Sequence, residues 1–166
     1  TQDSIEEAIK RFYSEEAFVD ESLQNLMSDD DFTITGPDEE EEDDLADGEN
    51  QANEAPVVKF VNLILMTALR DGASDVHFEP GEHECRIRLR TDGRLSEVPP
   101  PAKNIYNAIV ARTKILAGMD ISERRVPQDG RFKFRSGKKV IDLRVNTLPE
   151  VHGEKVVMRL LDRDSL

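Results

Sequence analysis

The chain has 166 residues and a formal net charge of −13, from 22 lysines and arginines against 35 aspartates and glutamates. The charge is unevenly divided: residues 1–56 hold 20 acidic and two basic residues, whereas residues 57–166 hold 15 acidic and 20 basic ones. The second part is therefore net positive, and the acidic total of the whole chain does not exclude phosphate-bearing partners. A single cysteine, Cys85, excludes an intramolecular disulfide, and no apolar run is long enough to span a bilayer.

Residues 1–28 predict two short amphipathic helices. In residues 4–13 the apolar side chains share one helical face, and Ser4 with Glu7 forms a capping box. A second apolar set occurs in residues 18–27. Two such helices bury little surface alone, so we interpret them as the helical remnant of a preceding N-terminal domain or as a docking segment.

Residues 29–55 predict a disordered acidic linker. The segment has few apolar residues and contains seven consecutive acidic residues at 38–44. Such a composition cannot bury enough apolar area to offset the entropy lost on ordering. We interpret it as a self-repelling spacer, with a specific acidic docking segment as the alternative.

From residue 56 onward the pattern is that of a folded domain. Pro56 suits the first turn of a helix with a broad apolar surface that extends to Leu69, and Gly72 is placed to end it. Asp92-Gly93 is a hairpin turn signal. Alternating apolar and polar residues predict three strands at Asp75–Glu79, 84–90 and Arg94–Val98.

The remaining elements follow three prolines at 99–101. A second helix is predicted at Lys103–Ala117, with Gly118 as its stop. Its expected core face is Ile105, Ile109, Val110, Thr113 and Leu116. Three more strands are predicted at 130–134, 139–147 and 154–161, with Ser136-Gly137 as the turn between the first two. Hairpin turns, strand alternation and two main helices predict an α+β domain with a largely antiparallel sheet over residues 56–166.

Several motifs in register then carry a resemblance. After the first helix come ASDVHFEP (73–80), RLRTDGRL (88–95), ERRVPQDGRF (123–132) and DLRVNTLPEVHGEKVVMRLLD (142–162). This order resembles the second N-terminal domain of the type II secretion and type IV pilus-assembly ATPases, and residues 1–28 resemble the end of the domain before it. The resemblance implies a PAS-like domain that sits on a RecA-like motor domain in a hexamer.

No GxxxxGK[ST] phosphate loop occurs in the chain. We therefore expect a fragment that stops before the motor, with ATP and Mg²⁺ bound by the parent ATPase and no cofactor held tightly here. The resemblance implies a regulatory nucleotide-clamp domain of an ATPase that powers protein export or pilus extension. It also implies a cytoplasmic location peripheral to the inner membrane, with the motor domain, neighbouring subunits and inner-membrane platform proteins as partners.

Arg144 in DLRV and Arg159 in VMRL resemble the two arginines by which the family's N-terminal domain reaches a nucleotide site. A guanidinium group is always charged and binds phosphate oxygens in a bidentate manner, so these arginines are the expected catalytic contribution. Arg131 is a further candidate for nucleotide binding. The alternative is that all three are ordinary solvated strand arginines.

Arg124, Arg125 and Arg131 flank a predicted turn at residues 127–130. They either line the same interface or pair with Asp129, and pairing is the favoured interpretation because ion pairs at turns are common and weak.

Histidine and carboxylate side chains raise a metal or acid–base hypothesis. Alternation puts Asp75, His77 and Glu79 on one strand face, but no further ligands have a suitable spacing, so no metal site is predicted and Asp75 is expected to cap or pair locally. His152 is a possible general base. The favoured interpretation there is a loop in which Gly153 adopts an unusual backbone angle.

Two other functions remain as alternatives. The first is a stand-alone PAS-like adaptor that binds a partner protein or a small ligand. The second is nucleic-acid binding through the basic strands, but the chain has two tyrosines, no tryptophan and no RNA-binding signature. We therefore expect no nucleic-acid partner.

Overall fold

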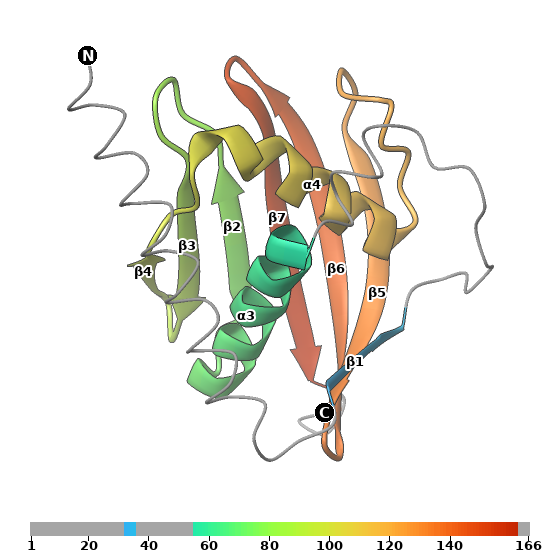
Figure 1. Ribbon diagram of the computed structural model, residues 1–166. Coiled ribbons are helices and arrows are strands. Elements are labelled where there is room, and N and C mark those ends of the chain that lie inside the picture. The colour runs from blue at the N-terminus through green and yellow to red at the C-terminus, as the bar shows by residue number, and fades with distance from the viewer. Residues whose placement is uncertain (1–31, 36–54, 163–166) are drawn as a thin grey trace.

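The computed structural model describes residues 32–35 and 55–162, which form a single antiparallel sheet with two helices on one of its faces (Figure 1). The strand order is β1-β5-β6-β7-β2-β3-β4, and every neighbouring pair is antiparallel. The strands are β1 (Phe32–Thr35), β2 (Asp75–Glu79), β3 (Arg86–Thr91), β4 (Arg94–Val98), β5 (Gln128–Ser136), β6 (Lys139–Glu150) and β7 (Gly153–Asp162). The helices are α3 (Ala55–Asp71) and α4 (Lys103–Ala117).

The predicted α+β class with an antiparallel sheet is confirmed. Helix α4 and strands β2 and β4 have the predicted bounds, whereas β5, β6 and β7 are longer than predicted. Helix α3 begins at Ala55, within the predicted linker, with Pro56 in its first turn. Among the described residues, no helix is both long and apolar enough to cross a membrane.

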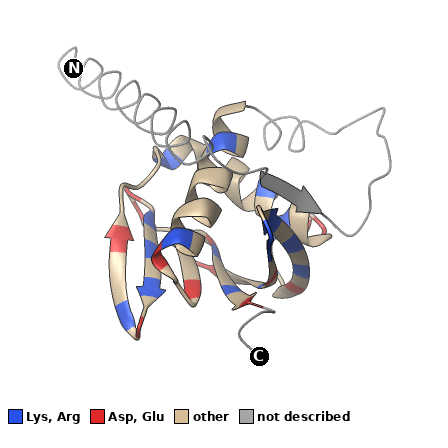
Figure 2. Cartoon of the chain, turned by 90° about the horizontal axis from the view of Figure 1, so that it is seen from below, with Lys and Arg blue, Asp and Glu red and all other residues tan. Residues whose placement is uncertain are grey.

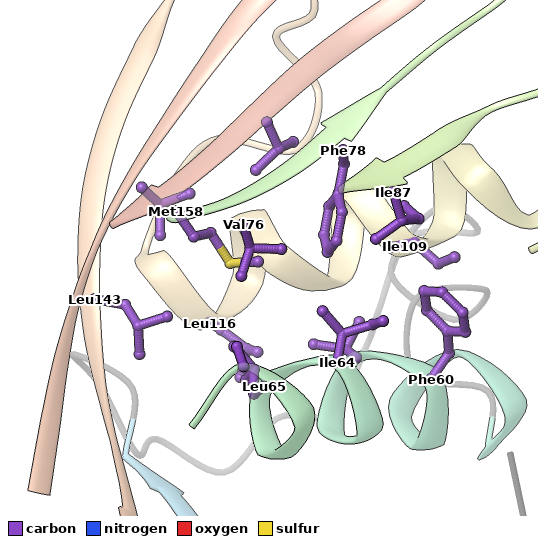
Figure 3. Close-up of a cluster of buried hydrophobic side chains, with 14 of the residues drawn as sticks. Phe60, Ile64, Leu65, Val76, Phe78, Ile87, Ile109, Leu116, Leu143 and Met158 are labelled. Carbon is purple, nitrogen blue, oxygen red and sulfur yellow. The ribbon is translucent and has the colours of Figure 1, made fainter. Parts of the chain in front are cut away.

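The hydrophobic core lies between the helices and one face of the sheet (Figure 3). Ile64 and Leu65 of α3 point toward Val76 and Phe78 of β2, and Met158 of β7 lies beside them. Phe78 is fully buried, which is worth about 1.5–3 kcal/mol for an aromatic or large aliphatic side chain. Successive strand residues point to opposite faces, so the polar residues between these core positions lie on the sheet face away from the helices, called here the open face.

The prediction of a disordered linker over residues 29–55 is wrong at Phe32–Thr35. These residues form β1 and pair with β5 from Phe32↔Ser136 to Thr35↔Lys133. Phenylalanine, threonine and isoleucine favour strands, and the outer edge of β5 gives them a partner that the acidic composition of the segment concealed. The rest of that segment, and the helices predicted at 4–13 and 18–27, lie outside the described residues.

The turn predicted at residues 127–130 is also wrong, because β5 already begins at Gln128. Gly130 lies within this strand where the end of α4 approaches it closely. A Cβ atom at Gly130 would lie 2.4 Å from the carbonyl oxygen of Ala117. The glycine is therefore explained by close packing of helix on strand and not by a turn.

A buried polar network fixes the connection between α4 and β5. The Lys114 Nζ donates to Glu154 Oε1 of β7 and to the Glu123 carbonyl oxygen, both at 2.7 Å. Gln128 binds the loop between α4 and β5: its Nε2 donates to the carbonyl oxygens of Asp120 and Glu123, at 2.9 and 3.1 Å. These hydrogen bonds join the loop after α4 to the first residue of β5, and α4 to β7.

Candidate anion-binding site

Three arginines lie directly opposite one another on neighbouring strands. Arg131 of β5 pairs in register with Arg144 of β6, which in turn pairs with Arg159 of β7. All three alternate with buried residues and are exposed on the open face. Side chains opposite each other in an antiparallel pair have Cβ atoms about 4.5–5.5 Å apart, so the three guanidinium groups share one stripe, called here the arginine row.

Only one arginine of the row has an ion-pair partner among the described residues, although the Asp129 carboxylate lines the same depression. Within the described part of the chain, the side chains of Arg131 and Arg144 have no hydrogen-bond or ion-pair partner. Arg159 donates from Nε to Asp75 Oδ1 at 3.1 Å, and its side chain remains 68% exposed. Like charges directly opposite each other destabilise a sheet, so the row is an arrangement that a bound anion would stabilise.

The row lines an open depression of about 550 Å³. Its lining residues are Asp129, Gly130, Arg131, Arg144, Val145, Asn146, Val157 and Arg159. The volume lies within the range of small-ligand sites, and the arginines supply several donors suited to phosphate oxygens. The depression therefore fits an oligophosphate group better than an apolar ligand.

The arginines of β3 differ from Arg131 and Arg144 because each of them lies beside a carboxylate. Figure 2 shows basic and acidic residues together on several strands. On β3, Arg88 donates from Nε to Glu79 at 2.9 Å, and Arg86 lies 3.2 Å from Glu97. Arg131 and Arg144 thus differ from the arginines of β3, for which ion pairs are present among the described residues.

The carboxylates and the histidine on β2 form ion pairs and packing contacts. Asp75 pairs with Arg159, 84 positions away in the chain, and Glu79 pairs with Arg88, whereas the expected local contact of Asp75 is a hydrogen bond from Ser74 Oγ at 3.0 Å. His77 lies between them; both of its ring nitrogens are shielded and have no hydrogen-bond partner among the described residues. Burial, and then the positive charge of Lys155, lower the pKa of His77 below its ordinary value of 6.5. Among the described residues no three His, Cys, Asp or Glu side chains gather in a metal-binding arrangement.

The other predicted candidates lie outside the depression. Arg124 and Arg125 are exposed in the loop before β5, and Arg125 lies 4.0 Å from Glu123 instead of pairing with Asp129. His152 is exposed in the hairpin between β6 and β7 and does not line the depression. The predicted unusual backbone angle at Gly153 is confirmed by its φ of 141°.

Two features of the site were not predicted from the sequence. The first is the alignment of Arg131 with Arg144, which the tight turn at Gly137 sets and which the turn signal could have revealed by counting outward along both strands. The second is the contact of Asp75 with Arg159. It depends on β2 pairing with β7 across 84 positions of the chain, and no local signal predicts that pairing.

Sequence comparison with known proteins identifies the family to which this chain is similar. The family model described as Type II/IV secretion system protein matches residues 50–166. The type IV pilus assembly ATPase PilB of Myxococcus xanthus is 49% identical over 166 residues, covering 98% of this chain and 28% of that protein. PilB of Pseudomonas aeruginosa is 56% identical over 120 residues, covering 72% of this chain and 21% of that protein.

The type II secretion system ATPase E of Vibrio cholerae is 43% identical over 136 residues, covering 82% of this chain and 26% of that protein. The chain therefore spans between 21% and 28% of the length of these curated relatives. Both the secretion and the pilus branches are represented among them.

Proposed function

The chain belongs to the type II/IV secretion system protein family, and we propose that it is the regulatory nucleotide-clamp domain of a hexameric secretion or pilus-assembly ATPase. In this proposal the domain closes on the parent's motor when ATP is bound. Arg144 and Arg159 then contact the phosphates during hydrolysis, and Arg131 adds a further phosphate contact. Hydrolysis and phosphate release weaken these contacts and open the clamp, which makes the domain a two-state element biased by nucleotide.

The arginine row is the observation that carries this proposal. Three cations held in register on neighbouring strands, two of them without a described side-chain partner, are complementary in charge to a polyphosphate. Arginine contacts to a transferring phosphoryl group contribute about 10³–10⁵ in rate in well-characterised systems. The position of the row on the open face leaves it accessible to another domain.

The proposal divides the chemistry between two parts of the parent. The described residues offer guanidinium groups for phosphate but no clustered carboxylates for a metal ion. Mg²⁺ and the phosphate loop would therefore be supplied by the motor, while this domain supplies charge neutralisation. The partners in this proposal are the parent's own motor domain, neighbouring subunits of the hexamer, and platform proteins at the cytoplasmic side of the inner membrane.

Steady-state ATP turnover of the full-length ATPase tests the proposal. Arg144→Ala and Arg159→Ala are each expected to lower kcat by about 10³-fold or more, the range known for arginines that contact a transferring phosphoryl group. Arg159→Lys should also lose activity, because an ammonium group cannot replace a bidentate guanidinium. Arg86→Ala, which removes an exposed arginine of β3, is the matched control and should leave kcat unchanged. Unchanged turnover of Arg159→Ala in an intact hexamer would refute the catalytic role.

The adaptor alternative predicts a different result. A stand-alone sensor would bind its ligand through the depression without any effect of the arginines on ATP turnover. Titration of this chain with a Mg²⁺–ATP analogue, followed by amide NMR, separates the two. Weak shifts near Arg144 and Arg159 without hydrolysis fit the clamp, whereas tight saturable binding fits a sensor.

A further inference from the structure

Asp75 of β2 lies next to Arg159, the last residue of the arginine row. It lies directly opposite Arg159 of β7 and, on its other side, directly opposite Arg90 of β3. The strand register thus places one carboxylate between the last arginine of the row and an arginine outside it. Asp75 is nearly buried although it lies on the open face, with a side chain only 12% exposed.

The two carboxylate oxygens of Asp75 have separate partners. Oδ1 accepts a hydrogen bond from Arg159 Nε at 3.1 Å. Oδ2 accepts one from Ser74 Oγ at 3.0 Å and lies 4.0 Å from Arg90 Nε. Contacts on both oxygens hold the plane of the carboxylate, so the direction of the bond to Arg159 is defined as well.

The contact with Asp75 uses only the inner nitrogen of the Arg159 guanidinium. A guanidinium has five N–H groups, and one is on Nε. The other four are on the terminal nitrogens, which make no side-chain contact within the described residues. Arg159 lines the depression and Asp75 does not. The carboxylate therefore contacts the Nε side of the guanidinium, and the terminal nitrogens remain available to bind phosphate.

We propose that Asp75 is the positioning residue of Arg159: it fixes the guanidinium in the orientation that engages phosphate. This inference rests on the proposed function and deepens it. Within the described residues, Arg131 and Arg144 have no equivalent carboxylate. Arg159 is therefore the preorganised member of the row, while the other two orient only when an anion arrives.

Glu79 provides a matched control, because it makes the same kind of pair on the same face of β2. It accepts from Arg88 Nε at 2.9 Å, and the two side chains are 20% and 27% exposed. Neither Glu79 nor Arg88 lines the depression. A general effect of losing a partly buried ion pair from β2 should appear in both Asp75→Asn and Glu79→Gln, whereas a positioning effect should appear only in the first.

The experiment compares Asp75→Asn, Glu79→Gln, Arg159→Ala and Asp75→Asn/Arg159→Ala in the full-length ATPase, with the hexamer confirmed for each. Asp75→Asn is expected to lower kcat by about tenfold to 10²-fold, the scale of a misplaced catalytic group. Glu79→Gln should leave kcat unchanged. The double variant should match Arg159→Ala, because the carboxylate acts only through that arginine.

A second measurement, made on the chain itself, does not depend on turnover. The Arg159 Nε–H should give a resolved, slowly exchanging NMR signal that Asp75→Asn abolishes and Glu79→Gln preserves. An unchanged signal in Asp75→Asn would overturn the inference, and so would an equal loss of kcat with and without Arg159. If Arg159→Ala lowers kcat but Asp75→Asn does not, the positioning role fails and the proposed function stands. Normal turnover of Arg159→Ala would instead refute the proposed function.

Discussion

Replacing Lys114 by methionine is expected to destabilise the domain by about 3–5 kcal/mol, the cost of removing one partner from a buried ion pair. The Lys114 side chain is 1% exposed and that of Glu154 is 8% exposed. Methionine fills a similar volume but leaves the Glu154 carboxylate in the core without its cation. Glu154 Oε2 already lacks a hydrogen-bond partner among the described residues, so the carboxylate has no second contact on which to rely.

The structure assigns most of this cost to the stranded carboxylate. The other acceptor of Lys114, the Glu123 carbonyl oxygen, keeps its hydrogen bond from Gln128 Nε2 at 3.1 Å after the substitution. Removing the charge from Glu154 as well should therefore recover stability. The double variant Lys114→Met/Glu154→Gln is expected to be more stable than Lys114→Met, with a coupling energy of about 2 kcal/mol.

Urea unfolding followed by circular dichroism measures both effects. With a slope of about 1.5 kcal/mol per molar urea, Lys114→Met should lower the midpoint by about 2–3 M. Lys133→Met is the control: Lys133 lies 3.9 Å from Asp142, and both side chains are more exposed, at 50% and 27%. Its cost should stay below about 1 kcal/mol. If Lys114→Met costs no more than Lys133→Met, the buried pair contributes little and the argument is wrong.

Two further predictions concern a glycine and a histidine. Gly130→Ala should cost about 1–3 kcal/mol, because the added methyl group would meet the Ala117 carbonyl oxygen at 2.4 Å and the helix or the strand must move; an unchanged urea midpoint would contradict this. Burial, and then Lys155, lower the pKa of His77 below 6.5, so the unfolded chain binds the proton more readily than the folded one. The stability contribution of His77 is therefore present above about pH 6.5 and lost as the pH falls through its lower folded pKa. Ring NMR should give a midpoint below 6.5, and His77→Gln should flatten the fall in stability between about pH 7 and 5; a midpoint at or above 6.5 would refute it.

Local signals explain why most elements were predictable. The second helix, α4, was found within its observed bounds because its apolar spacing, the preceding prolines and the stop at Gly118 all lie within a few residues. Strands β2 and β4 follow from alternation and from the Asp92-Gly93 turn. These patterns report short-range preferences, and here the tertiary structure agrees with them.

Contacts between residues far apart in the sequence could not be predicted from these local patterns. Strand β1 was missed because a window dominated by acidic residues conceals four strand-forming residues that are stabilised by pairing with β5. Lys114 was assigned no core role because lysine is rarely buried alone, and its partner Glu154 is 40 positions away. Neither contact leaves a periodic trace in the sequence.

The register of the sheet specifies the core and the arginine row together. Each arginine of the row has a buried neighbour in sequence: Phe132 follows Arg131, Val145 follows Arg144, and Met158 precedes Arg159. A slip of one residue in any of these strands would turn its arginine into the core and its apolar neighbour outward. Burial of those apolar side chains therefore fixes the strand register. The same register keeps the three like-charged arginines side by side, although like charges opposite each other destabilise a sheet.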